Sequence, residues 1–115
     1  MTKITRAISI KQPFVELILL GKKKQEYRGV RTHHRGRVYL YASMKPKDDP
    51  ELWRQVRREK GTLPKGLIVG SVEIVDCIRK GRKGFAYQLK NPKRLRRHLK
   101  ALNQPQPIFW IPRFS

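Results

Sequence analysis

The segment from Gly21 to Arg28, GKKKQEYR, places a lysine, a glutamate and an arginine close together. If residues 25–28 are extended, Glu26 and Arg28 lie on one face, because side chains two apart on a strand share a face. Lys23 precedes this segment and can lean into the same space. A carboxylate there can accept from a base amino group, while Arg28 can contact a phosphate or orient Glu26. The spacing therefore indicates a polar ligand site, and the structural alternative is a Glu26–Arg28 salt bridge that closes a barrel.

Three further polar residues lie on, or directly after, strands that the sequence predicts. Tyr41 and Ser43 come at the end of an apolar alternation, where their hydroxyls can reach a cleft. The alternative for this pair is a packed tyrosine and a loop cap, and the sequence leaves both open. Glu73 lies within an apolar run, and we expect it to face solvent, because a carboxylate turned inward needs a partner.

The histidines and the cysteine give little sign of metal chemistry. His33 and His34 are adjacent, with no acid or cysteine nearby in the sequence, so we expect solvated loop residues that touch phosphate. Cys77 is the single cysteine, which excludes an internal disulfide and a cysteine-rich metal site. We expect Cys77 to be a small buried side chain, and we predict no metal site and no cofactor.

Charge sets the class of partner. The chain has 115 residues, with 28 Lys+Arg against 8 Asp+Glu and a formal net charge of +20. Lysine and arginine displace counterions from phosphate backbones, so RNA is the expected partner and single-stranded DNA a possible one, while protein partners are unknown from the sequence. Phosphate contacts are expected from Arg35, Arg94 and Arg97, and Trp110 is the best candidate for stacking on an unpaired base.

Membrane association and secretion are not expected. No basic helix carries a broad apolar face, and no segment approaches the length needed to span a bilayer. The first six residues lack the apolar run of a signal peptide. We therefore expect a cytoplasmic protein.

The elements that must position these residues fit one domain over residues 1–115. Hydrophobic alternation predicts strands, and proline starts with glycine stops predict helices. The predicted strands are 5–10, 25–28, 36–42, 67–75, 85–89 and 108–111; the predicted helices are 13–21, 50–60 and a stretch from Asn91 in which Leu95, Leu99 and Leu102 are spaced i, i+4 and i+7. This mixture indicates an α+β fold, a small β-barrel of about six strands covered by two to three short helices.

Several blocks together resemble the ASCH domain of the PUA-like superfamily. They are SIKQPF before the first helix, GxKxxExR after it, RG leading to a strand that ends in YAS, LPxGxIVGxVE, YxLxNPxRL and the terminal FW. The resemblance covers nearly the whole chain. It implies a PUA-like barrel, a cleft lined by the GxKxxExR motif, and a role with RNA.

The same resemblance supplies an enzymatic alternative, a ribonuclease or an N4-acetylcytidine amidohydrolase. The amidohydrolase branch carries a lysine, a threonine three positions later and an acid on a later helix. Lys23 matches the lysine, Glu26 stands at the threonine position, and no acid follows Asp76. In a hydrolase, Lys23 and Glu26 would be the acid–base partners. A third possibility is a protein-interaction module in which the charge only supports assembly.

Overall fold

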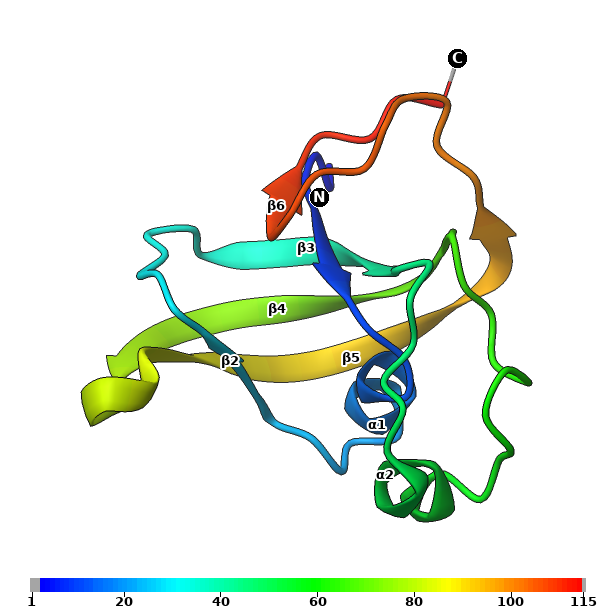
Figure 1. Cartoon of the computed structure of the whole chain (residues 1–115). Coiled ribbons are helices and arrows are strands. Elements are labelled where there is room, and N and C mark those ends of the chain that lie inside the picture. Colours follow the sequence, from blue (N-terminus) through cyan, green and yellow to red (C-terminus); the bar gives the residue numbers. More distant parts are fainter. Residues whose placement is uncertain (1–2, 115) are drawn as a thin grey trace.

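A single curved sheet forms the body of the protein (Figure 1). The computed structural model describes residues 3–114, apart from the Lys83 side chain. In chain order its elements are β1 (Ala7–Ile10), α1 (Phe14–Leu19), β2 (Gln25–Arg28), β3 (Gly36–Ala42), α2 (Pro50–Gln55), β4 (Leu67–Arg79), the 3-10 turn η1 (Gly81–Lys83), β5 (Phe85–Leu99) and β6 (Phe109–Trp110). The described residues confirm the expected α+β fold, as a six-stranded curled half-barrel with two short α-helices.

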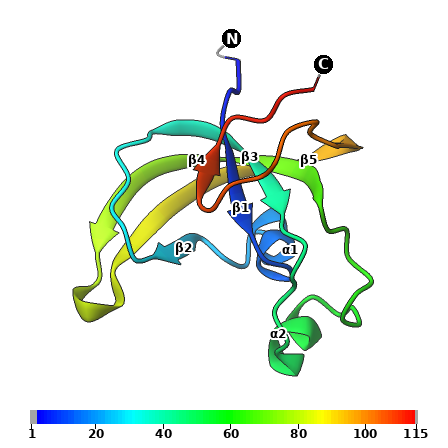
Figure 2. The same cartoon turned by 45° about the horizontal axis from the view of Figure 1, so that its top comes forward.

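The strand order is β2-β5-β4-β3-β1-β6, which leaves β2 and β6 at the two edges. The β1–β3 pair is parallel and the others are antiparallel. The β4–β5 hairpin is long and forms an arch in Figure 2, with β2 beneath it. Its register shifts at three places, and such irregularities bend a strand pair, so they let one hairpin supply much of the curl.

The core fills the inside of this curl. Strand residues that alternate inward meet two residues of α1, Val15 and Ile18, which close one end of the half-barrel. Tyr87 is fully buried at the centre, donates its hydroxyl hydrogen to the Val30 carbonyl at 2.7 Å and stacks on Phe109. Cys77 is buried beside this core, as expected.

Local sequence signals explain both helices. The buried Gln12 accepts from the Glu16 backbone N–H at 3.1 Å, and Gly21 ends the first helical segment with a φ of 78°. Asp49 caps α2 through the backbone N–H of Glu51. We expected the second helix to reach residue 60, but it ends at Gln55. No helix in the described part of the chain is long and apolar enough to cross a membrane.

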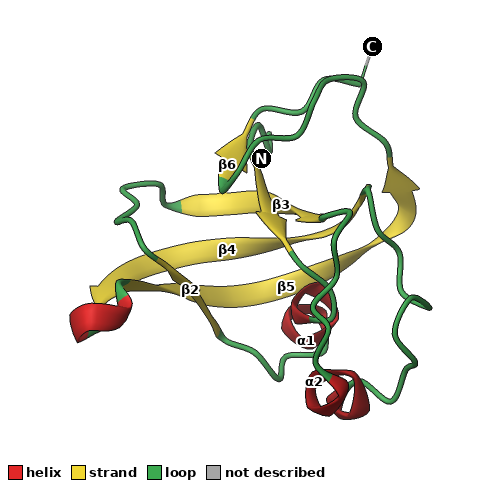
Figure 3. Cartoon of the chain, in the orientation of Figure 1, coloured by secondary structure: helices red, strands yellow, loops and turns green. Residues whose placement is uncertain are grey.

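The prediction of a third helix after Asn91 is wrong, because β5 continues to Leu99 (Figure 3). Leu95 and Leu99 pack against Ala7, Tyr41, Ile68 and Trp110, whereas Leu102 is 70% exposed. A spacing of four residues is an even number, so it also places two side chains on one face of a strand. β4 is likewise longer than predicted, since its last residues, Asp76 to Arg79, pair with Gln88 to Phe85 at the start of β5.

Candidate functional site

The motif residues Lys23, Glu26 and Arg28 meet as an ion triad. The Glu26 carboxylate is central, with Lys23 Nζ 3.5 Å from its Oε1 and Arg28 Nε 2.8 Å from its Oε2. The Glu26 side chain is only 8% exposed. Burying a carboxylate without partners is costly, so the two cations explain how Glu26 can lie inside. The structure thus brings together the three residues that the spacing grouped.

Arg28 also closes the seam between β1 and β2. These two strands are not neighbours in the sheet, yet an Arg28 guanidinium N–H donates to the Ser9 carbonyl on β1 at 2.6 Å. The Glu26–Arg28 salt bridge that the sequence left as an alternative is therefore present, but it lies within β2, and the bond from Arg28 to Ser9 is what links β2 to β1. Arg28 uses its Nε and one Nη2 donor on Glu26 and Ser9, so it orients the carboxylate, and its contact with phosphate stays a prediction.

Lys23 supports the carboxylate from the other side. Its ammonium lies 4.7 Å from the ring centroid of Phe14 and 5.4 Å from that of Tyr27. Contacts of this kind attract a cation to the negative face of a ring. Two rings and one carboxylate therefore fix the position of this ammonium.

A cavity of about 330 Å³ opens beside the triad. We call it the triad cavity; it is lined by Ser9, Lys11, Phe14, Glu26, Arg28, Ser43, Lys47, Pro107 and Ile108. Its volume falls within the range of small-ligand pockets. Glu26 is the sole acid among these lining residues, whereas Lys11 and Lys47 are exposed and add positive charge to it. The cavity thus combines a buried acceptor, an aromatic side chain and a basic surround.

Lys47 reaches this cavity through the packing of α2. Its backbone N–H donates to the Gln12 carbonyl at 2.8 Å, and its own carbonyl accepts from the Trp53 indole at 2.9 Å. Trp53 is buried against Leu17 of α1. The short second helix therefore serves to hold the Lys47 backbone at the site.

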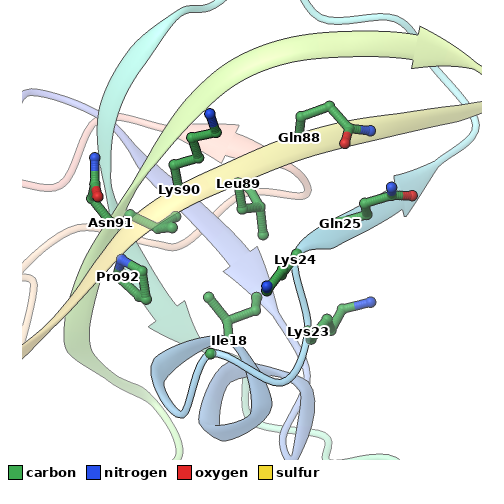
Figure 4. A pocket seen from close by; sticks show the side chains of 11 residues that line it. Ile18, Lys23, Lys24, Gln25, Gln88, Leu89, Lys90, Asn91 and Pro92 are labelled. Atoms are coloured by element: carbon green, nitrogen blue, oxygen red, sulfur yellow. The ribbon is translucent and has the colours of Figure 1, made fainter.

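A second cavity, of about 430 Å³, lies between α1, the approach to β2 and β5 (Figure 4). Apolar side chains meet lysines and amides there: Ile18, Val72, Leu89, Pro92, Lys23, Lys24, Lys90, Gln25, Gln88 and Asn91, with Gly21. Each amide already bonds within the protein: Gln25 accepts from Tyr27, Gln88 donates to the Ala86 carbonyl, and Asn91 donates to Glu73. This lysine–amide cavity contains no carboxylate among its lining residues, so the triad cavity is the more specific candidate.

Of the hydroxyl and indole candidates, Ser43 alone lines the triad cavity. Tyr41 is 6% exposed and meets Trp110 edge to face at 5.3 Å, and burial raises the pKa of the Tyr41 hydroxyl. Trp110 is itself 5% exposed, so its indole offers little surface to a base in this structure, and the stacking stays a prediction. The indole is buried because β6 pairs with β1 and turns Trp110 toward Leu95 and Leu99.

The three candidate arginines lie away from the triad cavity. Arg35 approaches Asp76 at 3.6 Å and donates to the Thr32 carbonyl. Arg94 makes a forked pair with Glu16 at 2.8 and 2.9 Å, and this hydrogen bonding raises the pKa of the arginine. Arg97 is exposed on β5. Arg94 therefore links β5 to α1, whereas the charge of Arg97 is exposed to solvent.

His34 does not behave as a free loop residue. Its ring packs against Phe109 at 5.7 Å, and its Nε2 is buried without a hydrogen-bond partner in the described part of the chain. Burial lowers the pKa of His34, and the charges of Arg6 and Arg35 lower it further. Within residues 3–114, no three His, Cys, Asp or Glu side chains converge as a metal site would require. Glu73 is half-exposed and pairs with Arg37 at 3.3 Å.

Several residues that line the triad cavity were not among those predicted from the sequence. Ser9, Lys11 and Phe14 lie in the SIKQPF block, which was noted as a motif but not as part of the site. Lys47 and Pro107 come from loops far from the motif, and no local pattern marks them. Their position depends on the packing of α2 and β6.

Comparison with known proteins places the sequence of this chain in a family. Over 81 residues the chain is 32% identical to activating signal cointegrator 1 of Homo sapiens, and it matches the protein of that name in Mus musculus equally. The match covers 62% of this chain but only 14% of those relatives. The family model of the ASCH domain matches residues 8–102, and the chain therefore belongs to the ASCH domain family.

Proposed function

We propose that this ASCH domain binds single-stranded RNA and holds one unpaired nucleotide in the triad cavity. The observation that carries the proposal is the buried Glu26 carboxylate, which is fixed between Lys23 and Arg28 and lines a cavity of about 330 Å³. A small structural salt bridge needs no such cavity. The family and its PUA-like fold, often linked to RNA binding, support the same proposal.

Glu26 would read the base edge. Its Oε2 is engaged by Arg28, whereas its Oε1 has only Lys23 at 3.5 Å and retains acceptor capacity. A carboxylate accepts well from an exocyclic amino group such as cytosine N4. We expect cytosine, adenine and guanine, which carry amino groups, to bind better than uracil.

The basic surface would supply most of the affinity. Lys11 and Lys47 line the cavity, and the chain as a whole carries a formal net charge of +20. Each neutralised phosphate releases a counterion, so the affinity for single strands should fall with salt at a slope of about −0.7 per phosphate contact. Phosphate contacts position the strand, and the Glu26 contact adds selectivity.

The test compares Glu26→Gln with a matched Glu59→Gln variant for binding to labelled single-stranded RNA, duplex RNA and DNA across a salt series. Both substitutions remove one negative charge, which by itself strengthens binding to a polyanion. Because Glu59 is exposed, its variant should bind as well as wild type or better. Glu26→Gln should instead bind at least about tenfold more weakly, which is the size of one good base contact.

Equal behaviour of the two variants would reduce the protein to a general polyanion binder. Selectivity for single-stranded DNA over RNA would contradict the choice of RNA. A urea titration of each variant confirms that the fold is retained. The hydrolase alternative is tested by adding a strand that contains N4-acetylcytidine to the same series. RNA fragments from either strand, or free acetate from the acetylated one, that appear with wild type and vanish in Glu26→Gln would make the domain an enzyme.

A further inference from the structure

A wide groove adjoins the triad cavity. It has a volume of about 610 Å³, and its rim is the segment Gln104–Pro107 between β5 and β6. We call it the QPQP groove; its other lining residues are Ser9, Lys11, Tyr41, Ser43, Met44 and Lys45. Ser9, Lys11, Ser43 and Pro107 line both spaces. The groove and the cavity are therefore neighbours, separated by the C-terminal end of β1.

We propose that the QPQP groove binds the nucleotide adjacent to the one in the triad cavity, so that the smallest complete ligand is a dinucleotide. This inference rests on the proposed function and extends it. Lys11 lies between the two spaces, at the position where a linking phosphate would run. Lys47 lines the cavity and Lys45 lines the groove, so a cation is available at either end of such a ligand.

The wall between the two spaces is held rigidly by Ser9. Its carbonyl accepts from Arg28 at 2.6 Å, its hydroxyl donates to the Gln106 carbonyl at 2.9 Å, and its N–H donates to the Ile108 carbonyl at 2.8 Å. One residue thus bonds both to the triad and to the groove rim. Because these bonds fix the relative position of the two spaces, a dinucleotide would meet a preorganised site.

The groove has a different chemistry from the cavity. Met44, Pro105 and Pro107 present apolar surface, and the exposed Gln104 and Gln106 carry amides that both donate and accept hydrogen bonds. No carboxylate lies among its lining residues. Apolar surface with adaptable amides accepts any base, so we expect the groove to tolerate sequence and the cavity to select it.

The experiment measures the affinity of a nucleoside 5′-monophosphate and of a 5′-phosphorylated dinucleotide, by calorimetry with the full chain. The cytosine base is used in both, so that the first nucleotide suits Glu26. Wild type should bind the dinucleotide at least about tenfold more tightly. The double variant Gln104→Ala/Gln106→Ala keeps the backbone carbonyl that Ser9 contacts, and it should lose most of this gain while binding the monophosphate normally.

Two single variants separate local contacts from bulk charge. Lys45→Ala removes one charge at the groove, and Lys80→Ala removes one charge next to the β4–β5 hairpin tip, outside both spaces. Lys45→Ala should weaken dinucleotide binding by several-fold more than Lys80→Ala does.

The possible failures are distinguishable. Equal affinity for both ligands, or a dinucleotide gain that survives the glutamine variant, would overturn the groove assignment and leave the cavity proposal intact. If Glu26→Gln binds the dinucleotide with the same affinity and the same base selectivity as wild type, the cavity proposal is overturned instead.

Discussion

The salt bridge between Glu26 and Arg28 should be measurable as a coupling energy in a double-mutant cycle. Arg28→Met removes the bond to Glu26 at 2.8 Å and the bond to the Ser9 carbonyl at 2.6 Å, but keeps an apolar stem. Hydrogen bonds to charged groups contribute about 1.5–3 kcal/mol each. Because Arg28 is 21% exposed and solvent replaces part of this, we expect a total loss of about 2–4 kcal/mol in the free energy of unfolding.

Glu26→Gln removes the ion pairs with Arg28 and Lys23 and leaves at most a neutral hydrogen bond in their place, while Arg28 can still donate to Ser9. We expect this variant to lose about 1–2 kcal/mol, close to one net hydrogen bond. The double variant should lose less than the sum of the singles, with a coupling energy of about 1–2 kcal/mol. Such losses matter for a chain whose total stability is on the order of 5–15 kcal/mol.

The assay is urea denaturation of the wild type, both single variants and the double variant, with tryptophan fluorescence as the signal of unfolding. Equal m-values are required, because a changed slope would mean a changed unfolded or native state. A coupling energy below about 0.5 kcal/mol is the additivity expected of independent sites. That result would refute the claim that Glu26 is held inside by Arg28.

Three further perturbations test other contacts in the same denaturation assay. The pKa of His34 is lowered in the folded state, so as the pH falls the unfolded chain binds a proton at this residue before the folded chain does. The free energy of unfolding should therefore fall as the pH drops below 6.5. His34→Gln should show a flatter dependence of stability on pH. Gly70→Ala should lower the free energy of unfolding by about 1–3 kcal/mol, because a Cβ there would lie 2.7 Å from a backbone oxygen of β5 and 2.7 Å from an α1 side chain. Gly29→Ala is the control: open space surrounds Gly29, so its stability should change by less than about 0.5 kcal/mol. Arg94→Met should cost about 0.5–1.5 kcal/mol, since the forked pair with Glu16 is well formed but Arg94 is 50% exposed; a loss above about 3 kcal/mol would contradict this.

The central part of the site was predictable because it is local. Lys23, Glu26 and Arg28 lie within one short segment, and an extended backbone is enough to bring their side chains together. The helix start at Pro13 and the stop at Gly21 are also local signals, and both hold in the structure. No tertiary knowledge was needed for these features.

The error at β5 has a physical origin. Leu95 and Leu99 are four residues apart, which suits one face of a helix and equally one face of a strand. Pairing with β4 decides between the two, since β5 can bury these leucines against Trp110 only as a strand. Leu102 would have discriminated, because its odd spacing fits the helix alone, and it is the leucine left exposed.

The rest of the cavity could not be predicted because distant segments supply it. Lys47 is positioned by bonds to Gln12 and Trp53, and Pro107 by the chain that leads into β6. The burial of Trp110 likewise depends on the β1–β6 pair. These positions follow from tertiary packing, which no short motif records.

The strand order has a consequence for how the site comes into being. β2 carries Glu26 but bonds along its length to β5, whose residues come much later in the chain. Closing so large a loop costs chain entropy before the contacts that offset this cost have formed, so non-local strand pairing slows folding. During synthesis the motif must therefore wait for β5, and for Ile108 beyond it, before its carboxylate can be enclosed. We expect the triad cavity to form late, together with the last strands, rather than to form stepwise from the motif.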